Sequence, residues 1–334
     1  MLARRRNLIP YFLLAPGLLW LVVFFAWPLV QVFLASFWSG SVEQGYSFSL
    51  SNWTNYPAAL DGVMPQVGRS LLYALVATVL TLLIAYPLAY TIAVRGGRAK
   101  NLLLFLVVAP FFTSYLLRTI SWKILLGDNG VLFGPLKSIG LIPDDFRVLA
   151  TPMAVVAGIT YTFLPFMVLP IYVALEKIDL RLVEAAQDLY AGPWRRSGML
   201  VGGFVGGILA LGLGLAFEWP LVVPVVLAAA IGGIVGRFLV SEAFVRVTFP
   251  LSLPGVFAGS LLTFIPAMGD YVNAEFLGNT DSRMLGNVIQ NRFLTQNNFP
   301  EAAALSFILM GGILIMVIIY TKLLGTEQLT NSRV

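Results

Sequence analysis

"VLATPMAVVAGITYTFLPFMVLPIYVAL", residues 148–175, contains no charged side chain. The hydrocarbon core of a bilayer is about 30 Å thick, and an α-helix needs about 20 consecutive apolar residues to cross it. The stretch is long enough for this and too apolar for the surface of a soluble helix. It therefore predicts a membrane-spanning helix.

Apolar runs of similar length recur along the whole chain of 334 residues, of which 58% are hydrophobic. Soluble domains have roughly 45–50% apolar residues, so the chain belongs to the membrane class. The sequence predicts an all-α polytopic membrane protein, a single transmembrane domain over residues 1–334 with six core spans. Besides 148–175, the core runs are Leu8–Val42, Ser70–Val94, Asn101–Leu126, Val247–Gly269 and Ala302–Thr321.

Two further uncharged runs, Ser197–Phe217 and Pro220–Gly236, are separated only by Glu218 and Trp219. They predict a membrane hairpin over residues 197–237 and eight spans in all. Glycines recur at four-residue spacing in the hairpin, which favours close packing of helix backbones in lipid. The two helices would then pack on each other, or they would offer a docking face to another membrane subunit.

The chain contains no cysteine and no histidine. Thiolate and imidazole ligands are therefore absent, as is the usual general base near neutral pH. No GxxxxGK[ST] phosphate-binding loop occurs either. We expect a transporter subunit rather than an enzyme, with no metal site and no cofactor, so that any ATP must be hydrolysed by another subunit.

Lysine and arginine gather on alternate sides of the predicted spans. Cytoplasmic loops carry an excess of these residues, which places both termini in the cytoplasm. Six spans and eight spans lead to the same assignment.

The segment "LRLVEAAQDLYAG", residues 180–192, is polar for this chain. Small and apolar residues recur every three or four positions in it, and acidic residues lie on the other faces, which predicts a short amphipathic helix. Helices that lie on lipid usually carry Lys and Arg on the polar face. The acidic centre of this helix favours a protein partner over the lipid surface.

Several segments resemble those of a known family. "EAAQDLYAGPWR" (184–195) and "FVRVTFPLSLPGV" (244–256) resemble the EAA loop of ABC-importer permease subunits. Three others resemble the polyamine (spermidine/putrescine) branch of that family. They are "PFFTSYLLRTISWKILLGDNG" (110–130), "FIPAMGDYVNAEFLG" (264–278) and "MLGNVIQNRF" (284–293).

The resemblance implies that a cytoplasmic helix docks into a separate ATPase. It implies two copies of this ATP-binding subunit, a second homologous permease subunit, an external solute-binding protein, contact with membrane lipid, and no nucleic acid. The location it implies is the bacterial plasma (inner) membrane. The residues expected to couple to the ATPase are Glu184, Ala185, Ala186, Asp188, Leu189 and Gly192.

Two departures from the family pattern affect this coupling segment. Tyr190 occupies the position of the usual glycine, and Gly192 follows two residues later. The predicted hairpin also separates Glu184 from Pro250, so we expect a coupling segment split between residues 184–195 and 244–250.

Polar groups at membrane depth are costly and mark pathways. A small organic cation, in this branch spermidine or putrescine, needs carboxylates and aromatic faces. The candidate pathway residues are Asp270, Tyr271, Glu275, Trp122, Asp128 and Tyr115. The alternative is that Asp270 and Glu275 face water or pair with Arg118 and Lys123.

The predicted function is that of a permease subunit of an ATP-driven importer, in which this chain forms the pathway for a small organic cation. Two alternatives remain open at this stage. One is a secondary transporter driven by an ion gradient, which would need a coupling-ion site near mid-membrane. The other is a membrane assembly subunit that transports nothing.

Overall fold

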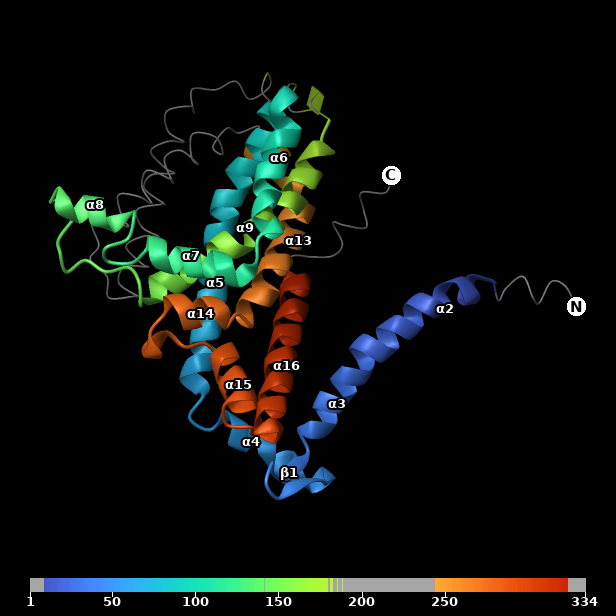
Figure 1. Cartoon of the computed structure of the whole chain (residues 1–334). Coiled ribbons are helices and arrows are strands. Elements are labelled where there is room, and N and C mark those ends of the chain that lie inside the picture. The colour runs from blue at the N-terminus through green and yellow to red at the C-terminus, as the bar shows by residue number, and fades with distance from the viewer. Residues whose placement is uncertain are drawn as a thin grey trace, which may run out of the picture. The chain divides into compact units, whose positions relative to one another are not determined.

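The computed structural model describes residues 9–140, 142–179 and 244–323, together with positions 181, 182, 185 and 188 (Figure 1). The chain forms two compact units. One comprises Met1–Val67 and Leu285–Tyr320, and the other comprises Gly68–Met284 and Thr321–Val334. Each unit is described separately.

The first unit begins with a long apolar helix that contains a π-helical turn in its middle. A two-stranded antiparallel sheet follows, in which Trp38 pairs with Phe48 and Ser41 pairs with Gly45. The elements of this unit are α2 (Ile9–Leu21), η1 (Val22–Ala26), α3 (Trp27–Ala35), β1 (Trp38–Ser41), β2 (Gly45–Phe48), η2 (Leu50–Thr54), α4 (Asn55–Leu60), α15 (Leu285–Leu294) and α16 (Phe299–Leu323, which runs slightly past the unit boundary).

The second unit is a bundle of long helices joined by shorter ones. Its first helix, α5, begins just before the unit boundary. The elements are α5 (Met64–Tyr90), η3 (Thr91–Arg95), η4 (Gly97–Ala99), α6 (Lys100–Val108), η5 (Ala109–Phe112), α7 (Tyr115–Leu125), α8 (Phe133–Ser138), α9 (Pro152–Glu176), η7 (Phe244–Thr248), α13 (Phe249–Met268), α14 (Val272–Leu277) and η8 (Thr280–Ser282).

Helices α9 and α13 pack closely in this bundle. A Cβ atom added at Gly255 of α13 would lie 2.5 Å from the carbonyl oxygen of Pro170 and 2.6 Å from the Cβ of Ala174. One turn further on, a Cβ at Gly259 would lie 2.9 Å from the sulfur of Met167. Glycines four residues apart on one helix face thus let the two backbones approach closely, as small residues do in membrane helices.

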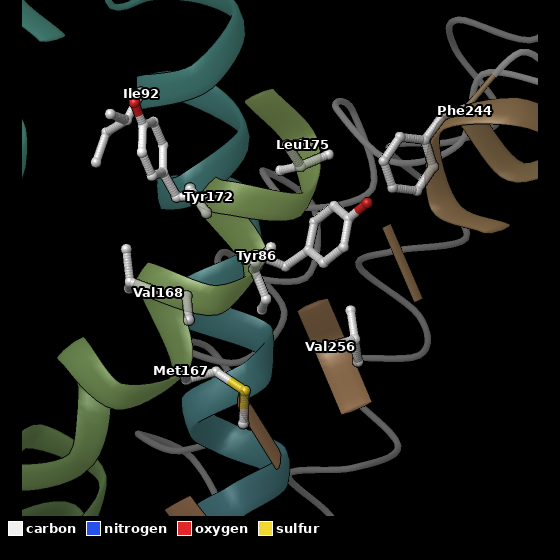
Figure 2. Packing of buried hydrophobic residues seen from close by; sticks show 11 residues of the cluster. Tyr86, Ile92, Met167, Val168, Tyr172, Leu175, Phe244 and Val256 are labelled. Atoms are coloured by element: carbon white, nitrogen blue, oxygen red, sulfur yellow. The ribbon is translucent and has the colours of Figure 1, made fainter. Parts of the chain in front are cut away.

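A buried apolar cluster includes residues of the α9–α13 contact and of α5 and η7 (Figure 2). Figure 2 shows Tyr86 and Phe244 near each other, and their ring centroids are 5.5 Å apart. The Tyr86 hydroxyl forms a hydrogen bond of 2.6 Å with Ser252, so α5 and α13 are joined by a satisfied polar contact within the cluster.

The described residues contain five helices that are long and apolar enough to cross a membrane, or six spans if one bent pair counts as one. They correspond to the six predicted core spans, which supports the polytopic class. The eight-span count is not confirmed, because the predicted hairpin at 197–237 lies outside the described residues.

The third predicted run, Asn101–Leu126, is not a straight span as its apolar composition suggested. Its two halves, Gly97–Phe112 and Tyr115–Leu125, meet at an angle of 96°. Pro110 stands in the last, 3₁₀ turn before the break, and Thr113 and Ser114 adopt non-helical backbone angles. In Figure 1, α7 accordingly runs across the direction of α6.

The first predicted run, Leu8–Val42, is also shorter than expected, since its helix ends at Ala35 and β1 follows. The expectation of an all-α chain is therefore wrong at residues 38–48. Gly40 has a φ of +116° and Gly45 a φ of +81°, which L side chains rarely adopt. These glycines permit the tight hairpin that ends the helical run.

Candidate functional site

The break between α6 and α7 places Tyr115 opposite Asp270. Tyr115 is the first residue of α7, and Asp270 lies in the short connection between α13 and α14. The Tyr115 hydroxyl donates to both carboxylate oxygens of Asp270, at 2.9 Å each. The structure thus joins two residues that the sequence proposed separately, from stretches more than a hundred residues apart.

Asn273 completes this group and was not among the predicted residues. Its backbone N–H donates to Oδ1 of Asp270 at 3.1 Å, and its side-chain amide donates to Oδ2 at 2.7 Å. The same amide donates to the Tyr115 hydroxyl at 2.9 Å and lies 3.4 Å from the Thr162 hydroxyl of α9. The one available signal was the spacing of Asn273 three residues after Asp270, on the same side of a helical turn.

Close packing of α9 and α14 holds Asn273 in place. A Cβ at Gly158 of α9 would lie 2.7 Å from Oδ1 of Asn273 and 2.5 Å from Cδ1 of Leu277. Asn273 is 1% exposed and Asp270 is 6% exposed. The carboxylate is therefore enclosed, with α7 and α14 supplying its donors and α9 packing against Asn273.

Neither alternative suggested for Asp270 holds in the structure. The carboxylate is buried rather than in contact with water, and no ion pair in the described part of the chain includes it. Burial raises the pKa of the Asp270 carboxyl above its usual range, while the hydrogen bonds from Asn273 and Tyr115 act in the opposite direction. Its hydrogen-bond donors are uncharged, and no lysine or arginine of the described residues forms an ion pair with it.

Arg118 lies one turn after Tyr115 and does not neutralise Asp270. Its guanidinium carbon is 5.8 Å from the centre of the Tyr115 ring and 5.4 Å from that of Phe111. Within the described residues, Nε and one terminal nitrogen of Arg118 are buried without a hydrogen-bond partner. Its charge is thus directed at aromatic faces.

The remaining pathway candidates lie in other surroundings. Asp128 forms ion pairs with Arg147 at 3.1 Å and Lys137 at 3.6 Å, so its charge is already balanced. Trp122 packs edge-on against Tyr161, with ring centroids 5.2 Å apart. Tyr271 and Glu275 are exposed at the start of α14. The buried group therefore contains only Tyr115 and Asp270 of the six candidates.

The predicted coupling residues fall largely outside the described residues, namely Glu184, Ala186, Leu189 and Gly192. Ala185 and Asp188 are described, and both are helical and exposed. Just before this segment, Lys100 of α6 donates to Glu176 at the end of α9 at 2.6 Å. The lysine also lies 5.3 Å from the centre of the Tyr172 ring.

Comparison with protein families matches residues 199–324 to the binding-protein-dependent transport system inner membrane component. The spermidine/putrescine transport system permease protein PotB of Haemophilus influenzae is 32% identical over 317 residues, covering 94% of this chain and 93% of the relative. PotB of Escherichia coli K12 is 30% identical over 316 residues, covering 94% of this chain and 96% of the relative. The inner membrane ABC transporter permease protein YdcU of Escherichia coli K12 is 26% identical over 266 residues, covering 75% and 68%.

Among solved structures, a bacterial ABC transporter involved in the import of the acidic polysaccharide alginate contains a similar chain. The TM-score is 0.62, and the match covers 96% of each chain at 15% sequence identity. At this identity the likeness concerns the fold alone. The PotB relatives match along nearly the full length of both chains, and they lead to one conclusion: this multi-pass membrane chain belongs to the family of inner membrane permease subunits of binding-protein-dependent ABC importers.

Proposed function

We propose that this chain forms part of the pathway through which an ATP-driven importer moves a small organic cation, spermidine or putrescine, across the plasma (inner) membrane of a bacterium. Its partners in this proposal are two copies of an ATP-binding subunit, a second homologous permease and an external solute-binding protein. Residues 184–195 and 244–250 couple the chain to the ATPase, and both termini are cytoplasmic.

The observation that carries the cargo class is the similarity to spermidine/putrescine permeases along 94% of the chain. The buried Asp270 group supports it independently. Polyamines carry several positive charges, and moving a cation out of water is costly unless an anion or a π face replaces its hydration. A buried carboxylate that forms no ion pair with the described residues, beside a tyrosine ring, has the chemistry to do so.

The proposal is tested on the complete complex, purified from its own host and reconstituted into liposomes that enclose ATP. External binding protein loaded with spermidine should stimulate ATP hydrolysis and the uptake of radiolabelled spermidine. Binding protein without cargo should stimulate neither to the same extent. Liposomes without ATP but with an imposed ion gradient are the control for secondary transport.

Two results would contradict different parts of the proposal. Stimulation by another solute, with none by spermidine or putrescine, would overturn the cargo class and leave ATP-driven import intact. Uptake that follows the ion gradient without ATP would overturn the import mechanism itself.

A further inference from the structure

We propose that Tyr115, Asp270 and Asn273 form a latch, in which the uncharged donors of Tyr115 and Asn273 occupy the Asp270 carboxylate until an ammonium group of the cargo displaces the Tyr115 hydroxyl. The three residues are called the Asp270 latch below. The inference rests on the proposed function, because it requires a cationic cargo, and it adds how the pathway closes and what opens it.

The side chains of Tyr115 and Asn273 carry fewer donor protons than the number of hydrogen-bond contacts they make. A tyrosine hydroxyl carries one proton, yet that of Tyr115 lies 2.9 Å from both oxygens of Asp270. A side-chain amide carries two protons, yet that of Asn273 lies within 3.4 Å of Asp270, Tyr115 and Thr162. These side-chain protons are shared, so the side-chain bonds to the carboxylate are weaker than their number suggests, whereas the backbone N–H of Asn273 adds an unshared bond.

An ammonium group supplies what the latch lacks. It brings a full positive charge, and a primary ammonium brings three N–H donors. Hydrogen bonds between two charged groups are shorter and stronger than those of uncharged donors. A cationic amine can therefore compete for Asp270, whereas an uncharged solute of the same size offers no charge to offset the buried carboxylate.

The geometry lets this exchange move a helix. Tyr115 stands directly after the two non-helical residues that separate η5 from α7, so α7 can pivot there. Asn273 is anchored differently, since it lies on α14 close to Asp270 and packs against Gly158 of α9. Loss of the Tyr115 bond would release the start of α7 from Asp270 while the Asp270–Asn273 pair stays in place, and Trp122 further along α7 would remain packed against Tyr161 of α9.

The test is equilibrium binding of radiolabelled spermidine to the complete complex in lipid nanodiscs, without the binding protein. Tyr115→Phe removes the competing hydroxyl and keeps the ring. We expect spermidine to bind about 2- to 12-fold more tightly, the factor that corresponds to one hydrogen bond of about 0.5–1.5 kcal/mol. Tyr86→Phe is the matched control, because it also removes a buried hydroxyl bond in the same unit, to Ser252, away from Asp270.

A double-mutant cycle separates the latch from a general loosening of the protein. Asp270→Asn should weaken binding, and adding Tyr115→Phe to it should then have no further effect. If the Tyr115→Phe complex does not assemble, Thr162→Val serves instead. It removes an acceptor that competes for the Asn273 amide protons, which then remain with Asp270 and Tyr115, so a smaller change of opposite sign, weaker spermidine binding, is expected.

Two outcomes would overturn the latch while leaving the proposed function intact. Weaker spermidine binding in Tyr115→Phe would make Tyr115 a ligand of the cargo rather than its competitor. A lower melting temperature with unchanged affinity would make the contact purely structural. Failure of the parental complex both to bind and to transport any polyamine would instead overturn the proposed function.

Discussion

Asp270 and Glu275 are five positions apart in the sequence. From residue type alone, both carboxylates are equally good candidates for binding a cation. Their surroundings are different, because Asp270 is enclosed by Tyr115 and Asn273 whereas Glu275 is exposed at the start of α14. Asp128, a third candidate, is already paired with Lys137 and Arg147. A charge in water is screened, whereas a buried one is not. Only the buried carboxylate is therefore expected to be decisive for a cationic cargo.

The first prediction follows at this scale. Asp270→Asn should reduce spermidine uptake by the reconstituted complex at least 10-fold, because an amide cannot offset the charge of a desolvated ammonium. Glu275→Gln should reduce it less than about 2-fold, since an exposed carboxylate contributes little. The double variant should resemble Asp270→Asn alone. Equal losses in the two single variants would show that burial does not distinguish these carboxylates.

Among the secondary-structure elements, the break in the third apolar run matters most for the candidate site. A straight helix from residue 101 to 126 would carry Tyr115 along the axis of α6, whereas the 96° bend directs α7 across it. The α9–α13 contact is the second such feature, since Gly255 and Gly259 let Pro170 and Met167 approach the α13 backbone. The bend positions Tyr115, and the α9–α13 contact positions the helix of Thr162 beside the one that leads to Asp270.

The second prediction concerns this helix contact. Gly255→Ala should destabilise the protein by about 1–3 kcal/mol, because the added methyl group would overlap backbone atoms that cannot rotate away. Gly311→Ala on α16 is the matched control, since a Cβ there has nothing within 4 Å. The melting temperatures of the purified variants provide the measurement. A Gly255→Ala variant as stable as the control would show that the helices can separate without cost.

The third prediction concerns the coupling segment. Glu184→Arg should leave membrane insertion and abundance unchanged but abolish transport and co-purification of the ATPase. Placing the wrong charge in a protein interface costs on the order of several kcal/mol. Glu43→Arg, in the exposed turn between β1 and β2, is the control for charge reversal as such. Normal transport by Glu184→Arg would contradict the assignment of this segment to coupling.

At the scale of the whole molecule, the described spans and the family agree on a multi-pass permease. The number of further spans between residues 195 and 237 decides whether residues 184–195 and 244–250 can act as one coupling segment. An even number leaves both pieces on one side of the membrane, while an odd number separates them.

The fourth prediction tests that arrangement. Single cysteines introduced at positions 43 and 218 should react with an impermeant reagent added outside, whereas cysteines at 195 and 237 should react only from the cytoplasmic side. The chain has no cysteine of its own, so each label reports a single site. Reaction of position 218 only from the cytoplasm would reduce the hairpin to a re-entrant or surface segment.

The apolar runs determined the membrane class of this protein and the positions of its core spans, because each span must by itself be long enough to cross the bilayer. The resemblance of a few short stretches was sufficient to indicate the family. Local composition could not reveal the bend at residues 113–114, since a broken helix and a straight one can be equally apolar.

The site itself was decided by tertiary structure. Tyr115 and Asp270 were recognisable as candidates, but their hydrogen bond joins segments 155 positions apart. Asn273 and Thr162 were missed because an amide and a hydroxyl become significant only when a buried carboxylate lies beside them. Desolvation and hydrogen-bond geometry depend on neighbours in space, and that is the information a linear pattern does not contain.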